Sequence, residues 1–274
     1  MRTLYPTIDW VLGTVRAPGV APSGTMDGMT TFGIWASFYV SSVVVLMFHI
    51  MERPISIAAV LGSGFLAMAI YVLHRTAPEV NDAMQQRHHQ AISQRSGMLF
   101  IVGLSSIVAC GMLYVVAPHL LLLLPIGCIA VTLYGRKIVG YPIRNLTLLK
   151  PLAVGCSIAI LAWVVTGNLW PPLAAIGLAI IVTTDALLCD IPDIEYDTAC
   201  GCTTLPSKTS ETTIWLIALM GNLAGAAFLW FVCASITGWL LLITFPSLYL
   251  LRRFDLRFFV DLRLPFVALL AWTV

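Results

Sequence analysis

Charged residues are scarce in this chain. Only 10% of its 274 residues are Asp, Glu, Lys or Arg, whereas an average soluble domain has about 25%. Hydrophobic residues make up 59% of the chain, and the mean hydropathy is +0.93. Fifteen basic and thirteen acidic residues cannot cover the surface of a soluble domain of this length, which excludes an ordinary cytosolic enzyme. Intrinsic disorder is excluded too, because it requires few apolar residues and a high net charge.

A strong net charge and a zinc-finger pattern are also lacking. The formal net charge is +2, so nothing indicates the strongly basic face that binds nucleic acid. The chain has seven cysteines, but Cys200 and Cys202 have no second pair at zinc-finger spacing. We therefore expect no nucleic-acid partner, and the sequence indicates no obligate protein partner.

Long apolar runs are what the sequence has in abundance. A helix needs about 20 mostly apolar residues to cross a bilayer. Nine runs approach that length: 30–50, 54–73, 98–117, 118–134, 149–168, 170–189, 212–233, 234–251 and 258–274. The sequence predicts an all-α membrane protein with nine transmembrane helices over residues 30–274. Residues 1–29 lack the residue order of a cleavable signal peptide, so we expect them to form a cytoplasmic lead-in.

The basic residues give an independent check on the nine-span count. If the spans alternate, the N-terminus and the links after spans 2, 4, 6 and 8 share one side of the membrane. That side holds fourteen of the fifteen Lys and Arg residues, Arg257 and Arg263 included, and leaves Arg53 alone opposite. The positive-inside rule assigns the basic side to the cytoplasm. We therefore expect a cytoplasmic N-terminus and a C-terminus on the opposite face.

Acidic residues gather at the end of the sixth apolar run. Among them, Asp190, Asp193 and Asp197 stand at i, i+3 and i+7, which places them on one helical face. Such carboxylates repel one another, and each would cost about 2.5–3.5 kcal/mol at a bilayer centre. A divalent cation is the expected remedy, and Mg²⁺ is usually held by one or two carboxylates plus substrate phosphates. The pattern favours a site for an amphiphile with a diphosphate head over a solvated acidic helix end.

The segment 190–206 resembles the second aspartate-rich motif of the UbiA superfamily of intramembrane prenyltransferases. That motif is D-x-x-D-x-x-x-D, followed by a glycine four residues on and then T-L-P, and Asp190, Asp193, Asp197 and Gly201 all match it. Members have nine transmembrane helices, and this motif follows the sixth. The resemblance implies a UbiA-like bundle with a cytoplasm-facing central cavity and Mg²⁺ as cofactor. It also implies a catalytic role for the three aspartates, the last two as Mg²⁺ ligands.

The superfamily's first motif, N-D-x-x-D-x-x-x-D, is only partly present after the second apolar run. Asn81 and Asp82 match, whereas Gln85 and His89 stand where the second and third aspartates are expected. The resemblance implies substrate binding by Asn81, Asp82 and Gln85, with Asn81 also a metal ligand. This face has lost two negative charges, and an amide is a weaker Mg²⁺ ligand than a carboxylate.

Three interpretations of the altered first motif stay open. The site binds one Mg²⁺ firmly and a second poorly, or Arg87 or His88 supplies positive charge to the diphosphate directly. In the third interpretation the protein has lost or altered the chemistry of the superfamily.

A tyrosine and several basic residues follow the fourth apolar run. They resemble the segment in which a tyrosine and basic residues of UbiA proteins approach the diphosphate. The resemblance implies substrate-binding roles for Tyr134, Arg136, Lys137 and Arg144. Cations of this kind can hold phosphate charge alongside Mg²⁺, although positive-inside topology also accounts for their position.

The leading hypothesis is Mg²⁺-dependent transfer of a prenyl group from a prenyl diphosphate to an aromatic or lipid acceptor within the membrane. Mg²⁺ and basic groups would stabilise the diphosphate leaving group as an allylic cation forms. One alternative is a UbiA-type terpene cyclase acting on a prenyl diphosphate. Another is a divergent non-catalytic membrane protein, such as a transporter, but transporters place charged sites near the midplane, whereas these acids lie at span ends.

Reporter fusions at the two ends of the chain test the predicted topology. With nine alternating spans, we expect the N-terminal reporter to report the cytoplasm and the C-terminal reporter to report the opposite compartment. Both reporters in the same compartment would make the span count wrong.

Overall fold

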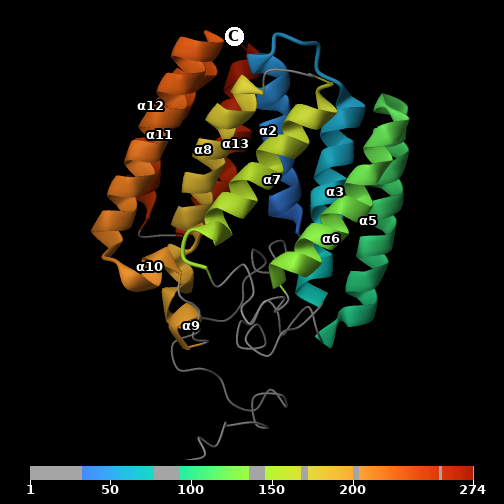
Figure 1. The fold of residues 1–274 in the computed structure, drawn as a ribbon, viewed down its shortest axis with the longest axis horizontal. Helices are drawn as coiled ribbons and strands as arrows, with labels where there is room; N and C mark the ends of the chain where they lie inside the picture. The colour runs from blue at the N-terminus through green and yellow to red at the C-terminus, as the bar shows by residue number, and fades with distance from the viewer. Residues whose placement is uncertain are drawn as a thin grey trace, which may run out of the picture.

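The computed structural model describes residues 33–76, 93–135, 146–167, 172–199, 204–252 and 255–273. Within these ranges the chain forms helices and no strands, and the long helices run up and down in one bundle (Figure 1). The elements, in chain order, are α2 (Ile34–Ile50), α3 (Ile57–Thr76), α5 (Arg95–Val116), the 3₁₀ helix η2 (Pro118–Leu122), α6 (Leu123–Gly135), α7 (Leu149–Val165), α8 (Leu173–Cys189), the 3₁₀ helix η4 (Ile191–Asp193), α9 (Ile194–Ala199), α10 (Leu205–Lys208), α11 (Glu211–Cys233), α12 (Thr237–Leu251) and α13 (Leu256–Thr273).

Each apolar run of the sequence contains one long helix in the described part of the chain, the fourth run with η2 leading into α6. By length and composition, α3, α5, α11 and the stretch Leu173–Asp193 can cross a membrane. Shorter apolar helices are α2, Pro118–Tyr134, α7 and α12. The expected all-α membrane fold is confirmed, while the number of helices that cross the membrane stays a prediction.

Short links join the helices at one end of the bundle, and α9 and α10 lie at the other (Figure 1). The C-terminal helix α13 ends on the side of the short links. The C-terminal end of α8 and the N-terminal ends of α7 and α13 therefore meet at the end that carries α9 and α10. This arrangement brings together residues from three distant parts of the sequence.

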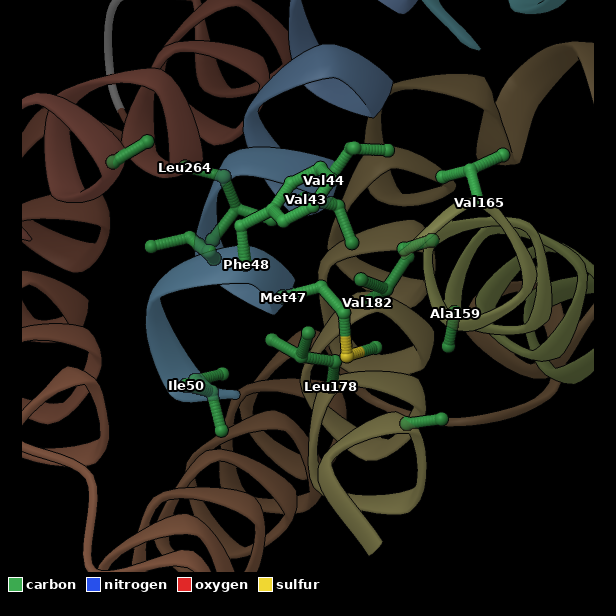
Figure 2. Packing of buried hydrophobic residues seen from close by; sticks show 14 of the residues in the cluster. Val43, Val44, Met47, Phe48, Ile50, Ala159, Val165, Leu178, Val182 and Leu264 are labelled. Atoms are coloured by element: carbon green, nitrogen blue, oxygen red, sulfur yellow. The ribbon is translucent and has the colours of Figure 1, made fainter. Parts of the chain in front are cut away.

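Helix α2 lies in the middle of the bundle, in contact with α3, α7, α8 and α13. Figure 2 shows Met47 of α2 close to Leu178 and Val182 of α8, with Ala159 of α7 beyond them. All four side chains are buried. The apolar core therefore joins α2 and α7 to α8, the helix whose C-terminal end leads into the acidic segment.

Close helix packing in the bundle depends on glycines, as is common between helices in membranes. A Cβ atom on Gly155 of α7 would lie 2.1 Å from Thr183 Oγ1 and 2.8 Å from the carbonyl oxygen of Ala179, both on α8. A Cβ atom on Gly225 of α11 would lie 2.7 Å from Ile181 Cγ1, also on α8. Helix α8 is thus held closely by neighbours on two sides.

Gly155→Ala should destabilise the protein, because the added methyl group meets the backbone of α8 and forces α7 away. Overpacking of this kind costs about 1–3 kcal/mol, which should lower the thermal midpoint of the purified protein by several degrees. Gly103→Ala is the matched control, since no atom lies within 4 Å of the added Cβ on α5, and alanine favours a helix over glycine by about 1 kcal/mol. Equal midpoints for the two variants would contradict the close α7–α8 contact.

Candidate magnesium and diphosphate site

The acidic segment begins where α8 ends. Pro192 cannot donate the backbone hydrogen bond that would continue α8, and a 3₁₀ turn follows Cys189 in place of further α-helix. The backbone N–H of Asp193 donates to the carbonyl oxygen of Asp190 at 3.1 Å. Residues i and i+3 lie on the same side of a 3₁₀ helix, so Asp190 and Asp193 stay on one face although the α-helix is broken.

Both aspartates are buried, and each forms an ion pair with a cation from another helix. Lys150 Nζ of α7 lies 2.6 Å from Asp190 Oδ1. Arg257 Nη2 of α13 lies 2.7 Å from Asp193 Oδ2 and also donates to the carbonyl oxygen of Cys189 at 3.0 Å. The carboxylate side chains are 8% and 10% exposed, while those of Lys150 and Arg257 are 22% and 23% exposed. The site therefore has two buried negative charges, each balanced by a cation that reaches the surface.

Sequence reasoning did not assign Lys150 or Arg257 to the site. Lys150 follows the basic segment after the fourth apolar run but was not among the expected substrate-binding residues, and Arg257 counted only as part of the basic cytoplasmic side. One signal was available in the sequence. Each is the second residue of an apolar helix, and the expected topology places both helix starts on the side of the acidic segment.

The remaining predicted site residues are only partly covered by the structure. Tyr134 lies in the last turn of α6, and its ring contacts the ring of His74 of α3 edge-on, with centroids 5.8 Å apart. Asp197 belongs to α9, but its side chain lies outside the described part of the structure. Also outside the described residues are Asn81, Asp82, Gln85, Arg136, Lys137 and Arg144.

Asp190 and Asp193 fit a Mg²⁺ ion that the substrate helps to hold. Mg²⁺ prefers oxygen ligands and commonly takes one or two carboxylates plus substrate phosphates. Among the described side chains, no group of three or more His, Cys, Asp or Glu could hold a metal ion. The other expected ligands, Asn81 and Asp197, lie outside the described side chains.

A second charged cluster lies inside the bundle, just over one helical turn before Asp190. Asp185 Oδ1 of α8 is 3.1 Å from Arg263 Nη2 of α13, and Tyr39 of α2 donates to Asp185 Oδ2 at 3.0 Å. Arg263 also donates to Asn222 Oδ1 of α11 at 2.8 Å. Arg263 is only 4% exposed, so its charge is neutralised within the bundle. Its expected place on the cytoplasmic side of the membrane stays a prediction.

A cavity of about 470 Å³ lies at the opposite end of the bundle, among the short links. Its lining includes Arg53, His119 and Leu120, and Arg53 Nη1 donates to the carbonyl oxygen of Thr166 at 2.8 Å. The cavity is thus separate from the aspartates, and the expected central cavity facing the cytoplasm stays a prediction.

No protein-family model and no curated protein matches this sequence. Solved structures of UbiA homologues do match the structure. The apo structure of a UbiA homologue from Aeropyrum pernix K1 has a TM-score of 0.60 and 13% identity, covering 87% of this chain and 97% of that one. A UbiA homologue from Archaeoglobus fulgidus bound to GPP and Mg²⁺ has a TM-score of 0.57 and 9% identity, covering 90% of this chain and all (100%) of that one.

A third structure, of a UbiA homologue from Archaeoglobus fulgidus bound to DMAPP and Mg²⁺, has a TM-score of 0.55 and 12% identity. It covers 88% of this chain and 96% of that one. In all three comparisons the likeness extends over most of both chains. This chain therefore adopts the fold of the UbiA homologues, as its acidic segment predicts.

Proposed function

We propose that this protein is a Mg²⁺-dependent enzyme that transfers a prenyl group from a prenyl diphosphate to an aromatic or lipid acceptor within the membrane. The observation that carries the proposal is the pair of buried carboxylates, Asp190 and Asp193, at the end of an apolar helix and beside two partly exposed cations. UbiA homologues of the same fold bind GPP or DMAPP together with Mg²⁺, which supports the same substrate class here. The site faces the cytoplasm in the proposed topology.

Asn81, Asp193 and Asp197 are the proposed Mg²⁺ ligands, and Asp190 directly precedes the 3₁₀ helix that ends at Asp193. Bound Mg²⁺ supplies Lewis acidity that stabilises the charge on the leaving diphosphate. In the absence of substrate, Lys150 pairs with Asp190 and Arg257 pairs with Asp193, and both cationic side chains are partly exposed. We expect these cations to bind phosphate oxygens when substrate is present. Since Asp193 already contacts Arg257, we expect Mg²⁺ to bind together with the diphosphate.

The reaction also requires a dry environment for the prenyl chain, which we expect the apolar helices to supply. An allylic cation is consumed by water unless the site excludes it. Next to the acidic segment, Leu187 and Leu188 of α8 pack in a buried apolar cluster with side chains of α11, α12 and α13. The acceptor is expected to be hydrophobic and to come from the membrane lipid phase.

Terpene cyclisation is the second candidate, and the altered first motif favours considering it, because Gln85 and His89 change the head-group site. Incubation of the purified protein with farnesyl or geranylgeranyl diphosphate and Mg²⁺, without acceptor, separates the candidates. A hydrocarbon product supports a cyclase, and turnover that requires an added acceptor supports a transferase. Absence of diphosphate binding would contradict both and favour a non-catalytic membrane protein.

Substitution of the second motif should harm turnover far more than substitution of the first. Asp193→Ala and Asp197→Ala each remove a carboxylate proposed to bind Mg²⁺, and we expect Mg²⁺-dependent diphosphate release to fall by at least about 100-fold. Gln85→Ala removes a neutral amide and should cost much less. Asp193→Asn is the control for packing, because it keeps the size of the side chain and should be nearly as inactive as Asp193→Ala. A Gln85→Ala variant as inactive as Asp197→Ala would contradict the expectation that the first motif contributes less to Mg²⁺ binding than the second.

Restoring a carboxylate in the first motif should strengthen metal binding. Gln85→Asp rebuilds N-D-x-x-D, and a charged oxygen ligand holds a hard cation better than an amide does. We expect the Mg²⁺ concentration for half-maximal binding of a non-hydrolysable prenyl diphosphate analogue to fall about tenfold, equivalent to about 1.4 kcal/mol.

Gln85→Asn is the neutral control for that titration and should leave the half-maximal concentration near the wild-type value. Weaker analogue binding by Gln85→Asp would instead show that Arg87 or His88 supplies the positive charge, since the new carboxylate would pair with it. An unchanged titration would show that residue 85 does not face the site.

A further inference from the structure

Helix α13 contacts the acidic end of α8 through two arginines. Arg257 pairs with Asp193 at the surface end of the bundle, and Arg263 pairs with Asp185 deeper inside it. The two helices are antiparallel, so the order of the arginines along α13 is the reverse of the order of their partners. The outer pair is partly exposed, whereas the side chains of Arg263 and Asp185 are only 2% and 1% exposed.

The inner pair is fixed from both sides by polar groups of two further helices. Tyr39 of α2 donates to Asp185 at 3.0 Å, and Asn222 of α11 accepts from Arg263 at 2.8 Å. Asn222 also donates to Thr184 Oγ1 at 2.6 Å, next to Asp185 on α8. Helices α2, α8, α11 and α13 therefore meet in one buried polar network.

This network is a poor source of stability. A buried ion pair is often matched or exceeded in stability by apolar residues of similar volume, because desolvation opposes the attraction. Nε and Nη1 of Arg263 have no hydrogen-bond partner in the described part of the protein. The cost of removing this guanidinium from water is therefore only partly offset by its contacts. Ionisable groups within a membrane bundle are rare and commonly functional.

We propose that the Asp185–Arg263 pair is a positioning element that fixes the register of α13 on α8 and so places Arg257 on Asp193. Apolar helix surfaces offer several packings of similar energy. The Asp185–Arg263 contact and the hydrogen bonds of its two ends to Tyr39 and Asn222 form together in only one of them. A slide of α13 by one residue moves it about 1.5 Å, enough to break the 2.7 Å contact between Arg257 and Asp193. The functional part of this inference, the effect on Mg²⁺ and diphosphate, rests on the function proposed above.

The direct test measures the register with two nitroxide labels. One label replaces Ile176 of α8 and the other Leu269 of α13, both exposed side chains, 44% and 64%. We expect a narrow distance distribution in the otherwise unchanged protein and a shift or broadening of about 1.5 Å or more in Asp185→Leu/Arg263→Met. Arg53→Met, which removes an arginine bonded at the opposite end of the bundle, is the control and should leave the distribution unchanged. An unchanged distribution in the double variant would overturn the proposal.

Asp185→Asn is measured beside the double variant in case the latter does not fold. It keeps an acceptor for Tyr39 but loses the charge that binds Arg263, so the distribution should again broaden. A folded Asp185→Asn protein with the original distribution would overturn the proposal equally.

A second measurement separates positioning from a purely structural role. In Asp185→Leu/Arg263→Met, with folding confirmed by its thermal midpoint, the Mn²⁺ or Mg²⁺ concentration for half-maximal binding of a non-hydrolysable prenyl diphosphate analogue should rise about tenfold, and in Arg53→Met it should not change. A stable double variant with an unchanged half-maximal concentration would show that the pair does not position the site. If the original protein binds no analogue at all, the proposed function is wrong, and the nitroxide distances still decide whether the pair sets the register.

Discussion

Neutralisation of negative charge inside an apolar bundle is the constraint on which the rest of this structure depends. Three buried carboxylates lie at or near the end of α8, and removal of one partner from a buried ion pair costs about 3–5 kcal/mol. Helices α7, α8 and α13 therefore cannot be repositioned independently of one another. Each carboxylate has its own cation: Asp185 with Arg263, Asp190 with Lys150 and Asp193 with Arg257.

The three pairs differ in their access to solvent, and this difference divides their roles. Lys150 and Arg257 are partly exposed. In the proposed site, Mg²⁺ can therefore replace them beside the carboxylates while they pair with the diphosphate, so that no buried charge is left without a partner. Arg263 cannot exchange in this way, because it is enclosed by α2, α8 and α11. In the proposed account, the outer pairs serve a site whose cations are exchanged, and the inner pair positions the helices that carry it.

Much of this arrangement follows from sequence, and the part that does not has a physical reason. Run length alone locates the long helices, and Pro192 alone explains why α8 ends where it does. The partners of the aspartates were missed, because pairing between α7, α8 and α13 depends on tertiary packing. The burial of Arg263 was missed for a related reason, since topology rules count charges by position along the chain and take no account of burial. The roles of Asn81, Gln85 and the basic residues after α6 stay predictions.

Calorimetric titration of the purified protein with Mg²⁺, with and without a non-hydrolysable prenyl diphosphate analogue, tests most directly whether carboxylates already paired with cations form a metal site shared with substrate. With the analogue present, Mg²⁺ should bind at the second motif. Without it, binding should be at least about tenfold weaker, a difference of about 1.4 kcal/mol, because the metal must displace Arg257 from Asp193 with no phosphate to receive the arginine. Equally tight Mg²⁺ binding in both titrations would contradict this account.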